Sequence, residues 1–225
     1  MSSELASMIQ AAVDDYEQWW LGVDLEIQRV VASCPDHSSE IGVFTKVTMI
    51  NRLYMTGLER HDEISDPSAL APAARVARCL VEHGAELDSR IRALRSLESL
   101  NPADLAVLVD THGWLVRTLR AAKVSRTVSF SSKYLHFHAP IVPIFDSIAY
   151  EALGRFAESE LGHSFRVTKE LIPATAYYAS EYRWLVARFA ELYRRVQDDD
   201  CRPGTTVKEL DHLLWGRTPW DAVKP

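Results

Sequence analysis

Apolar residues recur three and four positions apart along almost the whole of this 225-residue chain. That spacing is typical of helices that bury one face and expose the other. The longest stripe of this kind reads Tyr178, Tyr182, Leu185, Phe189, Leu192 and Val196. The strict alternation that is typical of a half-buried strand is confined to the short segment 165–167. We therefore expect an all-α fold of about ten helices, arranged in one domain that spans residues 1–225.

Capping residues, prolines and glycines indicate where these helices begin and end. The pairs 66–67 and 101–102 each place an N-cap residue before a proline at the first helical position. We expect helices to end or break at Gly57, Gly84 and Gly113. The loops at 64–72 and 198–205 are possible seams between subdomains. The expected caps or first residues, in chain order, are Ser3, Asp24, the segment Ser38-Ser39-Glu40, Asp66, Asn101, Asp146 and Pro173.

Composition limits the cellular compartments and the metal or cofactor chemistry that we expect for this chain. The three cysteines, Cys34, Cys79 and Cys201, are too far apart for a metal-binding pattern and too few for a cluster held by four thiolates. We expect reduced thiols, no metal site and no cofactor. The longest apolar runs, such as 139–145, are far shorter than the roughly 20 residues of a membrane helix. Because the first residues also lack the pattern of a signal peptide, we expect a cytoplasmic protein.

The net charge of −6 argues against a surface that binds nucleic acid over most of its area, because such binding depends on Lys and Arg neutralising phosphates. A local basic face can nevertheless occur on an acidic protein. One basic group, formed by Arg117, Arg120, Lys123 and Arg126, leads directly into the segment with the most distinctive chemistry. We interpret this group as a candidate phosphate-facing edge.

That segment runs from Ser129 to Ser147 and reads SFSSKYLHFHAPIVPIFDS. The pattern predicts a helix that carries Lys133 on its first turns and ends near 138–140, a proline-rich return, and a second helix that begins at Asp146. Such a return can bring Asp146 beside Lys133. Aromatic neighbours would desolvate the lysine and lower its pKa, while the helix dipole would favour the ionised aspartate. An amine beside a fixed carboxylate suits nucleophilic attack on a sugar C1′ carbon.

Lys133 followed by a helix and then by Pro143-Ile144-Phe145-Asp146 resembles the helix-hairpin-helix DNA glycosylases, specifically their 8-oxoguanine branch. The chain is also similar to a set of glycosylase-like bacterial proteins in which segments like 46–51 and 210–215 recur. The resemblance implies that Lys133 is the nucleophile, that Asp146 assists loss of the base, and that the partner is damaged double-stranded DNA. The implied activity is excision of an oxidised purine through a Schiff base, with DNA strand cleavage as a lyase.

Further residues complete the predicted site. Phe130, Tyr134 and His138 are candidates for substrate binding because they surround Lys133 in the sequence. The glycine-rich hairpin of the family is replaced here by 125–130, which contains neither glycine nor proline. Contacts to DNA phosphate are therefore assigned to a substitute set of side chains. That set is Ser125, Arg126, Thr127 and Ser129.

Two other interpretations stay open. The missing hairpin glycines favour a module that binds DNA or another partner without turnover, and the acidic charge is compatible with a helical protein that has no role with nucleic acid. His136 and His138 lack acidic or cysteine partners at ligand spacing, so we interpret them as ordinary histidines rather than metal ligands. The tryptophans on periodic stripes, Trp19, Trp20, Trp184 and Trp215, are expected to pack in the core.

Overall fold

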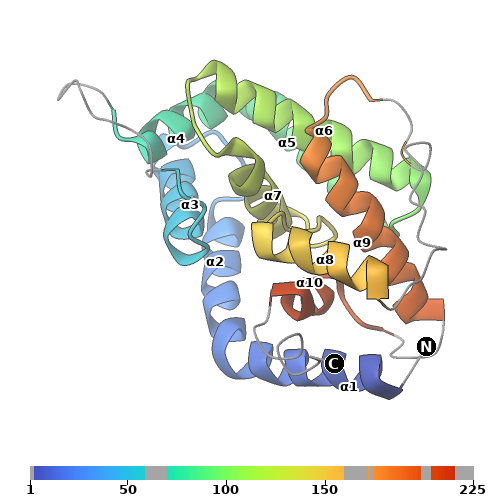
Figure 1. Ribbon diagram of the computed structural model, residues 1–225. Helices are drawn as coiled ribbons and strands as arrows, with labels where there is room; N and C mark the ends of the chain where they lie inside the picture. Colours follow the sequence, from blue (N-terminus) through green and yellow to red (C-terminus); the bar gives the residue numbers. More distant parts are fainter. Residues whose placement is uncertain (1–2, 59–69, 160–171, 173–174, 199–203, 216–225) are drawn as a thin grey trace.

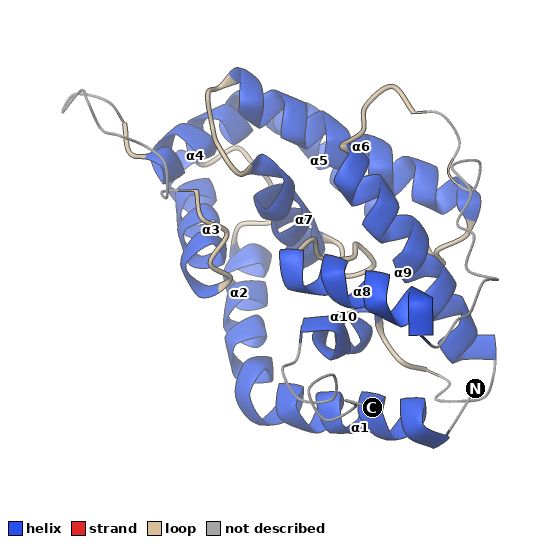
Figure 2. Cartoon of the chain, viewed as in Figure 1, coloured by secondary structure: helices blue, strands red, loops and turns tan. Residues whose placement is uncertain are grey.

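A computed structural model describes residues 3–58, 70–159, 172, 175–198 and 204–215. Helix and loop are the only conformations within these ranges, which confirms the all-α prediction (Figures 1 and 2). Most of the apolar side chains buried within them form one hydrophobic cluster. The elements, in chain order, are α1 (Ser3–Asp15), the π-helix η1 (Tyr16–Trp20), α2 (Leu21–Ser33), α3 (Glu40–Leu53), α4 (Pro72–Glu82), α5 (Gly84–Arg95), α6 (Pro102–Ala121), α7 (Thr127–His138), α8 (Ser147–Ser159), α9 (Ser180–Asp198) and α10 (Val207–Trp215).

Two of the predicted helix starts have a capping side chain. The Ser39 hydroxyl accepts a hydrogen bond from the Gly42 amide, and the Asn101 side chain accepts two from the first turn of α6. Pro102 occupies the first helical position of α6, where its missing N–H group has no intrahelical partner to lose. Local sequence therefore sets the start of α3 and of α6.

Asp24 was expected to begin a helix, and this prediction is wrong. The chain passes from α1 through η1 into α2 without leaving a helical conformation, turning at η1 (Figure 1). Asp24 lies within α2, where it is buried and accepts a hydrogen bond from the Tyr16 hydroxyl. A tertiary contact therefore explains an aspartate that resembled a cap.

The predicted break at Gly84 is confirmed, because α4 ends at Glu82 and α5 begins at Gly84, although Gly84 does not have the positive φ expected of a C-terminal glycine. The predicted break at Gly113 is wrong, because Gly113 lies inside the continuous helix α6. A Cβ at Gly113 would lie 2.4 Å from the Tyr178 amide nitrogen and 2.5 Å from the Tyr177 carbonyl carbon. The glycine therefore lets another segment of backbone approach α6 closely. Gly57 does have the positive φ expected of a glycine that follows a helix, although α3 itself ends at Leu53.

α7 is the central helix of the described part of the chain. It packs against α2, α3, α5 and α6, and every side chain from Phe130 to His138 is buried. It ends at His138 as expected, but Lys133 lies in its middle rather than on its first turns. The lysine is thereby surrounded by protein on a helix that has no solvent face along this stretch.

The last described helix packs against the first one. α10 contacts both α1 and α8, and Figure 1 shows it lying between them. The predictions for 66–67, Pro173, the strand at 165–167 and Cys201 lie outside the described residues, as do most of the seams at 64–72 and 198–205. The next described helix after Pro173, α9, begins at Ser180. None of the described helices has the length and apolar character needed to cross a membrane.

Candidate functional site

The return between α7 and α8 is held against α7 by side-chain hydrogen bonds. The Ser132 hydroxyl donates to the Ser129 carbonyl and accepts from the Phe145 amide, each at 2.9 Å. The His136 ring binds the Val142 carbonyl at 2.8 Å, so its Nδ1 atom carries the proton. These contacts fix the path of the chain immediately before Asp146.

Asp146 caps α8. One of its carboxylate oxygens, Oδ1, accepts a hydrogen bond from the Ile148 amide at 2.9 Å, and its carbonyl accepts from the Tyr150 amide. The other oxygen, Oδ2, lies 3.3 Å from Lys133 Nζ. The cap therefore orients the carboxylate towards the lysine, as the sequence led us to expect.

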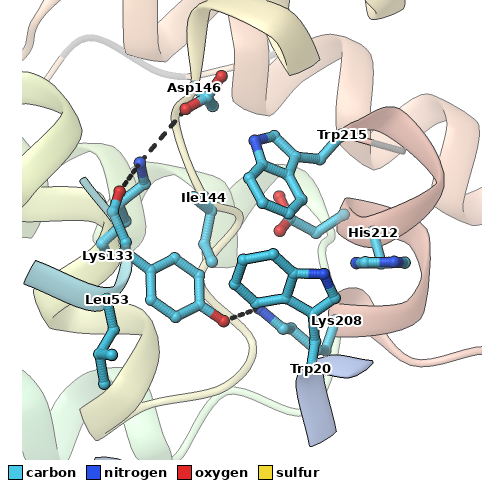
Figure 3. Close-up of a pocket in the computed structure, with 10 residues that line it drawn as sticks. Trp20, Leu53, Lys133, Ile144, Asp146, Lys208, His212 and Trp215 are labelled. Carbon is cyan, nitrogen blue, oxygen red and sulfur yellow. Dashed lines mark hydrogen bonds and ion pairs between the residues drawn. The ribbon is translucent and has the colours of Figure 1, made fainter. Parts of the chain in front are cut away.

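Lys133 is buried and has two polar contacts within the described chain. Besides the ion pair with Asp146, its Nζ donates to the Tyr54 carbonyl at 3.0 Å (Figure 3). Burial lowers the pKa of Lys133, and the Asp146 carboxylate opposes that shift without cancelling it. Desolvation thus increases the fraction of neutral, nucleophilic amine, which is the effect predicted from the aromatic neighbours.

A pocket opens beside this ion pair. Its walls come from both ends of the chain, because Trp20 ends η1 while Lys208, Asp211 and Trp215 belong to α10. The rings of Trp20 and Trp215 meet edge to face, with centroids 4.6 Å apart. In Figure 3 the two indoles lie across the pocket from Lys133 and Ile144. The site combines flat aromatic walls with an amine and a carboxylate.

Lys208 occupies a polar and aromatic niche in the same pocket. Its Nζ lies 2.7 Å from the Tyr54 hydroxyl and 3.3 Å from the Asp24 carboxylate. Asp24 also accepts hydrogen bonds from the hydroxyls of Tyr16 and Tyr54. Burial, reinforced by the Asp24 charge, raises the pKa of both tyrosines far enough to keep them neutral. This network joins α2, α3 and α10 behind the pocket.

The inner pocket is narrow and continues into a wider groove. Its free volume is about 20 Å³, room for about one water molecule. The outer groove has a free volume of about 740 Å³ and shares Trp20, Tyr54, Asp146 and Trp215 with the inner pocket. Arg126 and Ser129, two of the predicted phosphate ligands, also line this groove. A base placed beside Lys133 would require the indole rings to move apart.

Other predicted residues lie elsewhere. Phe130, Tyr134 and His138 are buried and are not among the described residues that line the pocket or the groove. The structure thus does not bring these three candidates for substrate binding to the site. His138 instead accepts a hydrogen bond from the buried Lys46 ammonium at 3.3 Å, and the Tyr134 hydroxyl bonds to His37 at 2.8 Å. They belong to the packing around α7.

The turn between α6 and α7 takes a shape usually reserved for glycine. Lys123 and Arg126 have φ values of 57° and 53°, so two basic residues adopt the left-handed conformation that a glycine-rich hairpin would use. Both side chains are exposed. Ser125 is half-buried, and Thr127 is buried at 2 % exposure, so the Thr127 hydroxyl does not face solvent. Of the predicted phosphate ligands, Arg126 and Ser129 have access to the groove.

Sequence reasoning missed the aromatic and α10 parts of the pocket. Trp20 and Trp215 were assigned to the core, yet they line the pocket, and Trp19 is 65 % exposed. Only the segment 210–215, which resembles a segment of the glycosylase-like bacterial proteins, pointed to α10, and no pattern in the sequence linked it to Lys133. Within the described residues, no three His, Cys, Asp or Glu side chains lie together as metal ligands would.

Comparisons with models of protein families, with characterised proteins and with solved structures found no match to this chain. The fold class therefore follows from the helices themselves, and the nature of the site follows from its residues.

Proposed function

We propose that this protein is a DNA glycosylase-like enzyme that excises a damaged base, an oxidised purine, through a covalent bond between Lys133 and the deoxyribose. The observation that carries the proposal is the 3.3 Å ion pair between a buried lysine and the N-cap carboxylate of α8, beside an aromatic pocket. The sequence resemblance to helix-hairpin-helix glycosylases led to the same two residues. Burial of the amine and fixation of the carboxylate both suit nucleophilic attack at C1′.

In this mechanism the nucleotide is rotated out of the duplex into the groove, where the indoles of Trp20 and Trp215 offer stacking surfaces. The neutral Lys133 amine attacks C1′ as the bond from C1′ to the base nitrogen breaks, and the bonding electron pair leaves with the base. The Asp146 carboxylate stabilises the positive charge that develops on the sugar. Arg126 and Ser129 contact the DNA backbone at the edge of the groove.

Borohydride trapping tests this mechanism, because it reduces a Schiff base to a stable amine. Wild-type protein should form a covalent adduct with a duplex that contains an abasic site or 8-oxoguanine, and mass spectrometry should map the adduct to Lys133. Lys133→Gln should abolish the adduct while keeping the thermal unfolding temperature within a few degrees. An adduct on Lys208, or wild-type protein that never forms one, would contradict the proposal.

A second function, DNA binding without turnover, is favoured by the small inner pocket, whose free volume of about 20 Å³ is too small for a base. In that case Lys133→Gln would bind duplex DNA as well as wild type does. Affinity would still fall steeply with salt, and Arg126→Gln would reduce the slope of log affinity against log salt concentration by about one, as expected for the loss of one phosphate contact. Absence of any salt-dependent binding would exclude both functions.

A further inference from the structure

Asp211 is a buried acid that the mechanism above does not use. Its side chain is 6 % exposed, and it lines the inner pocket together with Lys133 and Asp146. Burial and the charges of its neighbours, rather than hydrogen bonds, shift the pKa of its carboxyl. Asp24, the other buried aspartate nearby, has Tyr16, Tyr54 and Lys208 as partners. Burying a carboxyl costs free energy, so packing alone does not explain an aspartate at this position.

The charges around Asp211 come from four helices or their termini. They are Lys208 on α10 itself, Lys133 on α7, Asp146 at the start of α8 and Asp24 on α2. Burial raises the pKa of Asp211 to about 7, with the two lysines opposing that shift and the two aspartates adding to it. Near neutral pH the group therefore exchanges a proton readily, which is the condition for general acid–base catalysis.

The ammonium form of Lys133 has one N–H group left for a further acceptor. Its ammonium form carries three N–H groups, and those to Tyr54 and Asp146 account for two within the described chain. The inner pocket lies between these lining residues and has room for about one water molecule. Lys133 and Asp211 therefore border the same water-sized space.

We propose that Asp211 is the proton acceptor that activates Lys133, acting through a water in the inner pocket, and that it returns the proton later in the reaction. This inference rests on the proposed function. The ammonium of Lys133 passes one proton to the Asp211 carboxylate and becomes a neutral amine. During base excision the Asp211 carboxyl gives that proton to the departing base nitrogen and becomes a carboxylate again.

The same proton path applies to an abasic site, which presents a free aldehyde at C1′. The amine adds to the aldehyde carbon, and the carbonyl oxygen leaves as water after taking one proton from the amine nitrogen and one from Asp211. The product is a protonated Schiff base, which borohydride reduces. An abasic duplex therefore tests the proton transfer without requiring the damaged base to be known.

The experiment measures the rate of borohydride trapping on an abasic duplex between pH 5 and pH 9 for wild type, Asp211→Asn and Asp211→Ala. Both variants should lower the plateau rate about 100-fold, a typical contribution of acid–base catalysis. Added formate should restore the rate of Asp211→Ala, which leaves space for it, but not that of Asp211→Asn. Glu98→Gln, which changes an exposed acid outside the pocket, should react as wild type does.

An unchanged plateau in Asp211→Asn would overturn the inference. A profile that only moves to lower pH with the same plateau would also overturn it, because loss of the negative charge alone lowers the pKa of Lys133. If wild type itself forms no adduct at any pH, the proposed function fails first. If wild type reacts through Lys133 and both Asp211 variants do as well, only this inference fails.

Discussion

Ser131 and Ser132 are adjacent buried residues of α7 with different roles. The Ser132 hydroxyl bridges the Ser129 carbonyl and the Phe145 amide, and so joins α7 to the loop that leads to Asp146. The Ser131 hydroxyl is buried and has no hydrogen-bond partner in the described part of the protein. The two serines therefore form a matched pair for testing how that loop is positioned.

Ser132→Ala should lower the free energy of unfolding by about 1–3 kcal/mol, because it leaves the Phe145 amide without its acceptor. The same change should slow trapping by Lys133, since Asp146 follows directly after the released amide. Ser131→Ala, the control, should leave the free energy of unfolding unchanged or raise it, because it removes an unsatisfied hydroxyl. Urea denaturation measures both. Equal losses in the two variants would contradict this account of the loop.

Two glycines inside helices differ in how closely the rest of the protein approaches them. Gly22 and Gly113 both lie inside helices, and both would normally be counted as weak points. A Cβ at Gly22 would have no atom within 4 Å, whereas one at Gly113 would collide with the backbone of 177–178. Gly113 is needed for packing, while Gly22 is merely tolerated.

Gly113→Ala should lower the free energy of unfolding by about 3 kcal/mol through overpacking against backbone that cannot rotate away. Gly22→Ala should raise it by about 0.5–1 kcal/mol, because alanine has the greater helix propensity. Thermal or urea denaturation of the two variants gives the comparison. A stabilised Gly113→Ala would show that segment 177–178 does not pack on α6 as the structure has it.

Helix-scale features were predictable where local chemistry determines them. The caps at Ser39 and Asn101, the cap at Asp146 and the end of α7 all follow from short sequence patterns. The errors at Asp24 and Gly113 share another cause, because each residue is fixed by a contact with a distant part of the chain. A local pattern cannot distinguish an aspartate that caps a helix from one that binds two tyrosines.

The same limit applies to the candidate site. Lys133 and Asp146 are separated by 13 positions, and the helix, the return and the cap between them could be inferred from the sequence. Trp20 and Asp211 line the same pocket from opposite ends of the chain. They line it together because α10 packs against α1 and α8, which no spacing rule predicts.

For the molecule as a whole, buried histidines make stability depend on pH. Burial lowers the pKa of His37 to about 4 and that of His112 and His136 to about 3, against an ordinary value of 6.5. Below pH 6.5 the unfolded chain therefore binds more protons than the folded one. The stability contributed by the neutral rings is complete above pH 6.5 and is lost as the pH falls towards 4 and then 3.

The free energy of unfolding should thus decrease by about 1.4 kcal/mol per pH unit for each of these histidines well below pH 6.5. Urea denaturation at intervals from pH 7.5 to pH 5 measures the slope. His136→Asn keeps a donor for the Val142 carbonyl but cannot take up a proton. It should therefore reduce the slope by the contribution of one histidine, about 1.4 kcal/mol per pH unit, even if the variant is less stable at pH 7. An identical slope would contradict a neutral, buried His136.

The pairing of the first and last described helices has a consequence for a protein during its synthesis. Lys208 and Tyr54 are 154 positions apart, and His212 binds Asp15 across 197 positions. Before α10 has docked, the pocket beside Lys133 lacks the wall that Lys208, Asp211 and Trp215 form. A water-exposed lysine is protonated and reacts slowly with aldehydes. Docking of α10 therefore completes the burial that lowers the pKa of Lys133.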